Sequence, residues 1–431
     1  MNRGDYLLLP EERSILTLMI NTAAIKKSFQ SNRVERYALF LLVMMLFGLG
    51  GGLFRGVQDN YLAYLGIDEA GRGIVEFFRE LPGLLLFLLL ALLYRMAERR
   101  IIRLALGFSV AGMIGFLALG TSIVPAVISL TLWSLGEHLI MPVRQSYAIH
   151  SAEPGREGAA IGLLRGVENA GQVIGLAIVS LIFLMPSIRS DRDAGGRQGF
   201  VIVFIAVACL IILALITSLG IVQSKGKLQR KRLYFRKKYG KYYGLEVFYG
   251  ARKQVFLTFG PYLLILHYGA KTEYLASILG LCALLNIFFT PLIGRLIDRL
   301  GYRTIMIGDT VVLFFVCLFY GFAHRIFPHE IAFIVVSINF VLDWIISNAS
   351  MASSVYVSRI SEDKEEMTST LSTGISINHL ISVAIAFFGG FIWKSFGVEW
   401  LFSLAALMAV GNSLFALSIP RVLARENPAE A

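Results

Sequence analysis

Charged residues are scarce in this sequence. Asp, Glu, Lys and Arg make up 16% of its 431 residues, whereas hydrophobic residues make up 56%. Soluble domains contain about 25% charged and about 45 to 50% apolar residues. The composition therefore excludes an ordinary water-soluble globular protein and indicates a chain that lies mostly in a membrane. No polar stretch is long enough to build the core of a separate soluble domain.

Cysteine is also rare, and the motifs of several enzyme classes are missing. Cys209, Cys282 and Cys317 lie in apolar stretches without the paired spacing of a metal site or a disulfide framework. The phosphate-binding Gly-x-x-x-x-Gly-Lys loop and the zinc-binding His-Glu-x-x-His pattern are both absent. We therefore expect no cofactor, no direct use of ATP and no enzymatic activity.

Long apolar runs predict twelve transmembrane helices, because about 20 mostly apolar residues are needed to cross a bilayer. The predicted spans are residues 37–57, 74–96, 101–120, 123–147, 158–186, 199–222, 245–266, 272–294, 303–324, 328–356, 368–393 and 398–420. The expected fold class is an all-α polytopic membrane protein made of two pseudo-symmetric six-helix halves. The expected divisions are an N-terminal tail (1–36), a first bundle (37–222), a basic linker (223–244), a second bundle (245–420) and a C-terminal tail (421–431).

Positive charge is distributed unevenly over the loops. The linker at 223–244 holds nine Lys and Arg and no acid, and a cytoplasmic N-terminus puts 27 of the 40 basic residues on the cytoplasmic side and 7 on the other. Membrane proteins keep their basic loops in the cytoplasm. We therefore expect both termini and the linker to be cytoplasmic, in a membrane such as the bacterial inner membrane. The basic excess then sets topology, with anionic lipid as a further contact, and we expect no nucleic-acid partner.

The loop between the eighth and ninth predicted spans carries a short motif. In order, its residues are Gly294, Arg295, Leu296, Ile297, Asp298, Arg299, Leu300, Gly301, Tyr302 and Arg303. This motif resembles the signature loop of the major facilitator superfamily. The matching stretch between the second and third spans, residues 91–100, keeps only the basic end.

The resemblance implies two six-helix halves that transport a solute by alternating access. It also implies a gating loop formed by Gly294, Asp298, Arg299, Gly301 and Arg303. In physical terms, the glycines would permit sharp bends, the acid would cap a neighbouring helix and the arginines would pair across the bundle. The alternative is that the arginines only anchor the loop at lipid headgroups.

Ionisable side chains lie inside several predicted spans of the first half. Each costs roughly 2.5 to 3.5 kcal/mol at mid-helix, so it persists where it faces a partner, water or a substrate. The fourth span carries Glu137 and Arg144, two turns apart on one face. The fifth span carries Arg165 and Glu168 among glycines that allow close helix approach. These helices are expected to share polar partners, either as a substrate site or as a salt-bridge network that only holds this half together.

The second span carries three charges on one face near its outer end. Glu76, Arg79 and Glu80 are spaced three and four residues apart. Such spacing predicts ion pairs along the helix, and a purely structural role is the simplest interpretation.

The second half offers a matching set of polar positions. Arg252 lies in the seventh span before Gly260 and Pro261, which are expected to break the helix in the membrane. Asp343 lies on a polar face of the tenth span, and His379 lies on one of the eleventh. We interpret Arg252, Asp343 and His379 as further residues for substrate binding or proton coupling.

The predicted site is a central cavity between the halves. Residues Glu137, Arg144, Arg165 and Glu168 would face Asp343 and His379 across it. An unpaired Asp343 would exchange the coupling proton, and Arg165 would anchor the substrate. The excess of embedded arginine favours an anionic or zwitterionic organic solute.

The sequence thus predicts a secondary active transporter, monomeric in the lipid bilayer, which moves a small organic solute and is coupled to a proton or another cation. Two alternatives remain at this stage. A lipid flippase or a non-transporting sensor could keep the same fold. A membrane-embedded transferase would need a convergent His, Asp or Ser site near the membrane surface.

Overall fold

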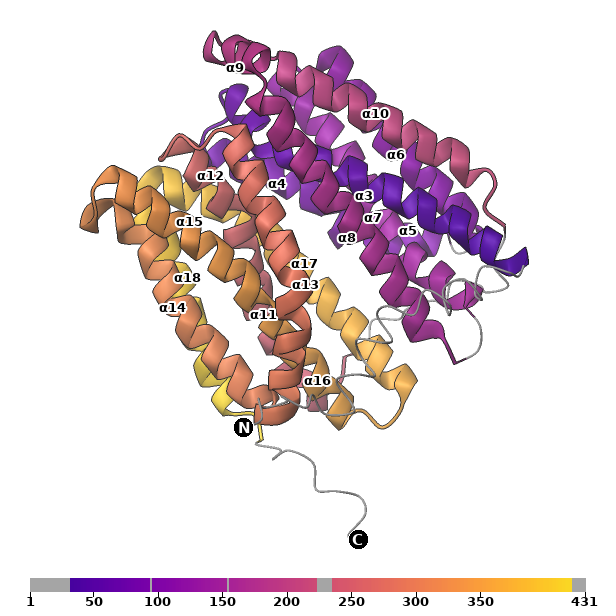
Figure 1. Cartoon of the computed structure of the whole chain (residues 1–431). Helices are drawn as coiled ribbons and strands as arrows, with labels where there is room; N and C mark the ends of the chain where they lie inside the picture. Colours follow the sequence, from indigo (N-terminus) through magenta and orange to yellow (C-terminus); the bar gives the residue numbers. More distant parts are fainter. Residues whose placement is uncertain (1–31, 94, 153–154, 223–234, 421–431) are drawn as a thin grey trace, which may run out of the picture.

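The structure, a computed structural model, describes residues 32–93, 95–152, 155–222 and 235–420. These residues form helices arranged as two bundles side by side, one from the first half of the chain and one from the second (Figure 1). The first bundle contains α3 (Asn32–Tyr64), α4 (Glu69–Leu84), α5 (Leu86–Leu92), α6 (Glu98–Leu119), α7 (Ile123–Ser151), α8 (Glu157–Leu184), α9 (Pro186–Asp193) and α10 (Gln198–Ser218). The second contains η1 (Lys237–Tyr239), α11 (Gly240–Gln254), η2 (Val255–Phe259), α12 (Gly260–Leu266), α13 (Thr272–Leu300), α14 (Tyr302–Ile326), α15 (His329–Ile346), η3 (Ser347–Ser350), α16 (Met351–Ile360), α17 (Lys364–Phe396) and α18 (Val398–Leu417).

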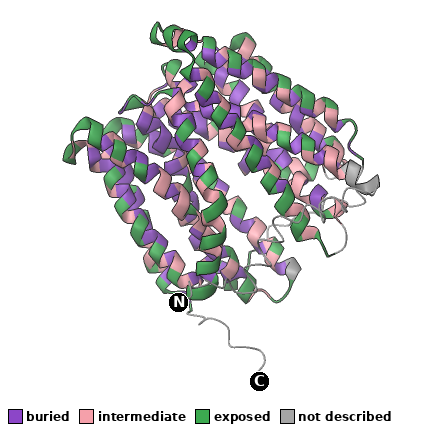
Figure 2. Ribbon diagram, in the orientation of Figure 1, coloured by how far each residue is buried: buried purple, intermediate pink, exposed green. Residues whose placement is uncertain are grey.

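The all-α fold class is confirmed, and helical segments cover all twelve predicted spans. Ten helices in the described part of the chain are long and apolar enough to cross a membrane. The second and seventh predicted spans are outside these ten, and both carry several charges. The tenth span is among the ten, although the 3-10 segment η3 lies between its α15 and α16 parts. The outward faces of the bundles carry many exposed residues (Figure 2), and many of these are Leu, Ile and Phe. Such an apolar exterior matches a lipid environment.

The interruptions of the second and seventh spans each lie close to a proline. In the second span, α4 ends at Leu84 shortly after Pro82, and α5 begins at Leu86. In the seventh span, the chain widens into a π-helical turn at Val255–Phe259 just before Pro261. Proline lacks a backbone N–H and cannot complete the α-helical hydrogen-bond ladder. The predicted break at Gly260 and Pro261 is therefore confirmed.

Glycines bring α3 and α8 into close contact. A Cβ atom built on Gly52 would lie 2.2 Å from the carbonyl oxygen of Gln172, and one on Gly175 would lie 2.4 Å from that of Leu49. No larger residue fits at either position without moving backbone. Small residues spaced along a helix allow such backbone approach in membranes, and this approach brings the polar side chains of α8 beside those of α3.

The two halves are joined at the end of the molecule that holds α9 and α12. There α4 packs against α17, where a Cβ on Gly73 would lie 2.4 Å from the carbonyl oxygen of Ala386. The Tyr262 hydroxyl donates to the carbonyl oxygen of Ile67 at 2.6 Å. Lys394 pairs with Asp68, and the hydrogen bond from its ammonium lowers the pKa of the Asp68 carboxyl. The ribbons of the two halves diverge toward the α16 end (Figure 1).

Candidate functional site

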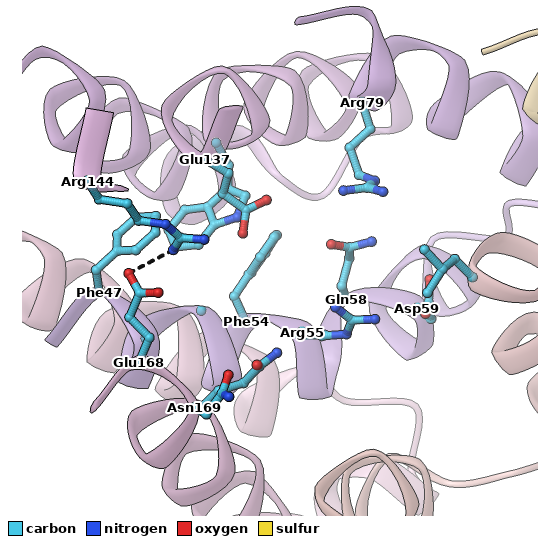
Figure 3. Close-up of a pocket in the computed structure, with 15 residues that line it drawn as sticks. Phe47, Phe54, Arg55, Gln58, Asp59, Arg79, Glu137, Arg144, Glu168 and Asn169 are labelled. Atoms are coloured by element: carbon cyan, nitrogen blue, oxygen red, sulfur yellow. Dashed lines mark hydrogen bonds and ion pairs between the residues drawn. The ribbon is translucent and has the colours of Figure 1, made fainter. Parts of the chain in front are cut away.

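A polar cavity of about 240 Å³ lies within the first bundle, where this bundle borders the second half. Its wall is formed by residues of α3, α4, α7 and α8, with one residue of the second half, Leu257. The charged residues that line it are Arg55, Asp59, Arg79, Glu137, Arg144 and Glu168 (Figure 3). A cavity with three guanidinium groups and three carboxylates suits a charged or strongly polar solute.

Arg144 and Glu168 form an ion pair across this wall. The Nη1 atom of Arg144 donates to Oε1 of Glu168 at 2.8 Å, joining α7 to α8 (Figure 3). The expectation that these two helices share polar partners is therefore confirmed. The Glu137 carboxylate points into the same cavity, toward Arg79. A role for these three residues in solute binding stays a prediction.

Arg55 is a cavity residue that the sequence analysis did not select. It lies at mid-length of α3, and its guanidinium carbon lies 5.0 Å from the ring centroid of Trp344. Trp344 belongs to α15, so this cation–π contact joins the two halves. Within the described residues no hydrogen bond or ion pair to the Arg55 side chain is found. The signal available in the sequence was an arginine inside an otherwise apolar helix.

A chain of ion pairs follows one face of α4. Arg72 contacts Asp59 at 3.0 Å and Glu76 at 2.8 Å. Arg79 contacts both Glu76 and Glu80 at 2.6 Å. The predicted pairing in the second span is confirmed, while its extension to Asp59 on α3 depends on tertiary packing. This network places the Arg79 side chain at the cavity wall.

A second cavity, of about 480 Å³, lies within the second half. Arg252, Lys253, Glu246 and Asp343 line it, and Leu257 lines both cavities. Leu257 lies in the π-helical turn, so this distorted segment separates the two cavities.

Asp343 is paired, and the prediction that it is an unpaired carboxylate is wrong. Arg252 donates to both carboxylate oxygens of Asp309 at 2.8 Å and to Oδ1 of Asp343 at 3.2 Å. All three side chains are buried. Asp309, in α14, was not selected from the sequence because its position beside Arg252 follows only from the packing of α14 against its neighbours.

His379 pairs with a residue outside the predicted site. Its Nδ1 atom lies 3.1 Å from Oε2 of Glu80 on α4, and its ring lies 5.5 Å from that of His138 on α7. The predicted site residues therefore lie in separate places. Glu137, Arg144 and Glu168 line the first cavity, Arg252 and Asp343 line the second, and His379 lies in a separate buried cluster.

Arg165 lies outside the lining of both cavities. Its side chain is exposed on α8, one turn before Glu168. The Arg165 side chain therefore points away from the wall of the first cavity, which Glu168 helps to form. Its proposed role as substrate anchor thus has no support in the geometry of either cavity.

The gating loop is a tight connection between α13 and α14. Gly301 adopts a φ of +82°, which a glycine tolerates best, and it precedes Tyr302. The predicted bend at Gly294 is wrong, because α13 continues through it to Leu300. The predicted helix cap by Asp298 is also wrong, since no side chain caps α14.

The remaining loop residues are open to solvent or partly so. Asp298 and Arg299 are exposed, and Arg303 is intermediate. The loop lies at the diverging end of the bundles, next to α16 (Figure 1). A gating role for the loop stays a prediction.

Comparison with known proteins supports the family and the fold. Residues 242–431 match the sequence model of the Major Facilitator Superfamily. A search of curated protein sequences found no significant match.

Solved structures match over both halves of the chain. A D-xylose–proton symporter has a TM-score of 0.68 at 15% identity, over 89% of this chain and 96% of that one. A POT family transporter in complex with 5-aminolevulinic acid has a TM-score of 0.69 at 14% identity, over 88% and 95%. The nucleoside transporter NupG has a TM-score of 0.66 at 12% identity, over 90% and 98%. The second half of the chain thus matches the Major Facilitator Superfamily by sequence, and nearly the whole chain has the fold of these solved transporters.

Proposed function

We propose that the protein is a secondary active transporter that moves a small anionic or zwitterionic organic solute by alternating access. The solute would bind in the first cavity, which borders the second half at Leu257. The observation that carries this proposal is Arg55, a guanidinium in the cavity wall with no ion-pair partner among the described residues.

The chemistry of the cavity favours a solute with a carboxylate or another anionic group. A guanidinium offers a planar pair of donors that matches a carboxylate, and the interaction is strong where water is excluded. Arg144 is already paired with Glu168, and Arg79 with Glu76 and Glu80. Arg55 is therefore the cation left for a ligand.

Glu137 gives the cavity a second site of opposite charge. Its carboxylate points into the same space (Figure 3). A solute with an amino group and a carboxyl group would satisfy both Glu137 and Arg55. The polar wall is a poor match for acyl chains, so the lipid flippase alternative receives no support from this cavity.

The second cavity suggests where a coupling proton could bind. Asp309 and Asp343 share the single guanidinium of Arg252, so the group carries two carboxylates for one cation. A bound proton would balance this charge. The two cavities meet at Leu257, in a helix segment that is already distorted and well suited to change shape during transport.

Substitution of Arg55 tests the binding site. Loss of a charged hydrogen bond costs about 1.5 to 3 kcal/mol, so Arg55→Gln is expected to weaken solute binding roughly 10- to 100-fold. Arg55→Lys keeps the charge without the planar fork and should give an intermediate loss. A thermal-shift screen of amino acids, carboxylates and nucleosides on purified wild-type protein supplies the ligand. Binding and counterflow are then measured in the same preparation.

Arg165→Gln is the matched control, because Arg165 is an exposed arginine outside both cavities. It should bind as the wild type does. Unchanged affinity in Arg55→Gln together with weakened affinity in Arg165→Gln would reverse the assignment.

Accumulation in wild-type proteoliposomes with and without an imposed pH gradient tests the coupling, and equal accumulation would remove the proton from the proposal.

Orientation in the membrane is part of the same proposal, with the α16 end on the cytoplasmic side. Ser358 on α16 and Ser190 on α9 are both exposed and lie at opposite ends of the molecule (Figure 1). In intact cells, a membrane-impermeant thiol reagent should label Ser190→Cys but not Ser358→Cys until the cells are permeabilised. Replacing exposed Cys209 removes background labelling. The reverse pattern would contradict the proposed topology.

A further inference from the structure

Three potential metal ligands meet in the membrane between the two halves. Glu80 comes from α4, His138 from α7 and His379 from α17. Their exposed fractions are 3%, 5% and 7%. One ligand atom from each residue lies within 4.8 Å of the other two. None of the three lines either cavity.

The cluster is held in a geometry that suits a metal ion. Nδ1 of His138 lies 2.8 Å from the carbonyl oxygen of Ser134, so it donates its proton there and leaves the Nε2 lone pair free. Arg79 binds Oε1 of Glu80 at 2.6 Å, which leaves Oε2 directed toward His379. Such outer contacts typically orient metal ligands.

Gly83 provides the space in which the two rings approach each other. A Cβ atom built there would lie 2.6 Å from Nε2 of His138 and 2.9 Å from Cε1 of His379. Any other residue would push the rings out of place. The close approach of the two histidine rings therefore requires a glycine at this position.

We propose that Glu80, His138 and His379 bind one Zn²⁺ ion or a similar borderline divalent cation. Two imidazoles and one carboxylate form a ligand set typical of zinc with an open fourth position, whereas Mg²⁺ and Ca²⁺ prefer oxygen ligands alone. Zinc–ligand distances of about 2.0 to 2.2 Å require ligand atoms about 3.3 Å apart. Nδ1 of His379 and Oε2 of Glu80 already lie 3.1 Å apart.

The charges around Glu80, His138 and His379 allow a cation to bind there. Arg79 is the nearest fixed positive group, and it is balanced by Glu76, with which it forms a second ion pair. The carboxylate of Glu80 can therefore contribute its charge to the ion.

The ion would link the two halves, because His379 belongs to the second bundle and the other two ligands to the first. A ligand that binds one conformation more tightly shifts the population toward it. Zinc should therefore stabilise the conformation in which α4 packs against α17 and should slow transport.

Isothermal titration with zinc chloride tests the site in chelator-treated, full-length protein in detergent. We expect one tight site per chain, with affinity at least about 100-fold weaker in His379→Gln, a larger loss than that of an outer contact. His324→Gln is the matched control. His324 lies beside His267, with ring centroids 4.9 Å apart, at the other end of α14 from the gating loop. Its substitution should leave the tight site unchanged.

X-ray absorption on the zinc-loaded wild type gives a result that does not depend on any variant. It should show nitrogen and oxygen ligands with imidazole scattering from two histidines. Absence of tight zinc binding to the wild type, or equal loss in His324→Gln and His379→Gln, would overturn the proposal. Size-exclusion profiles identify a variant that has misfolded, and Gly83→Ala then serves as the second test, with the same expected loss. Because no solute is present, the outcome is independent of the Arg55 experiments.

Discussion

Arg252→Gln is expected to destabilise the protein by about 3 to 5 kcal/mol, the usual loss when one partner of a buried ion pair is removed. The substitution leaves the carboxylates of Asp309 and Asp343 without the guanidinium that they share. Both carboxylates and the guanidinium are buried, and Asp309 lies outside the lining of both cavities, so its carboxylate would be left with little access to water. Equilibrium unfolding in mild detergent measures the difference from the wild type.

Two comparisons show whether the loss comes from the unpaired charges. Arg299→Gln changes an exposed arginine and should alter stability by no more than about 0.5 kcal/mol. Adding Asp309→Asn and Asp343→Asn to Arg252→Gln replaces the ionic group by neutral amides and should recover part of the stability. A triple variant no more stable than Arg252→Gln would show that the loss has another cause.

Cross-linking α4 to α17 at the joined end is expected to reduce transport to the level of empty liposomes. Asp68 and Lys394 contact each other there, and the helices behind them approach at Gly73 and Gly390. Alternating access requires this end to open once in every cycle. In a background without native cysteines, Asp68→Cys with Lys394→Cys is treated with a short thiol cross-linker that a reductant cleaves. Uptake is measured before and after cleavage.

The single variants Asp68→Cys and Lys394→Cys are the controls for this experiment. Asp68 also caps α4 through the backbone N–H of Gly71, so its loss costs roughly 1 kcal/mol of stability without any cross-link. Each single variant should keep transport after treatment. Full transport by the cross-linked protein would contradict alternating access through this end, whereas solute binding from the α16 end should persist.

Much of the architecture follows from the sequence alone. Hydropathy predicts all twelve helical segments, since a backbone in lipid must satisfy its hydrogen bonds within the helix. Pairs on one helix, such as Arg79 with Glu76, follow from spacing alone. The break before Pro261 follows from the chemistry of proline. Each of these features depends on residues within a few turns of one another.

The candidate site depends on contacts between helices that are distant in sequence. Asp343 was predicted to be unpaired, yet Arg252, which lies 91 residues away in sequence, donates to it. The pairing of His379 with Glu80 joins residues 299 positions apart. Spacing along a helix gives the face on which a side chain lies but not the helix that it meets.

Thus the sequence by itself determined the membrane class, the twelve segments and the residue types at membrane depth, because these depend on local hydrophobicity and hydrogen bonding. Only the tertiary structure decided which charges are paired. The packing of the helices places Arg55 in the wall of the first cavity and Arg165 outside it, although both are arginines within apolar helices. The physical reason is that the stability of a buried charge depends on the groups within a few ångströms of it, and the packing of helices chooses those groups.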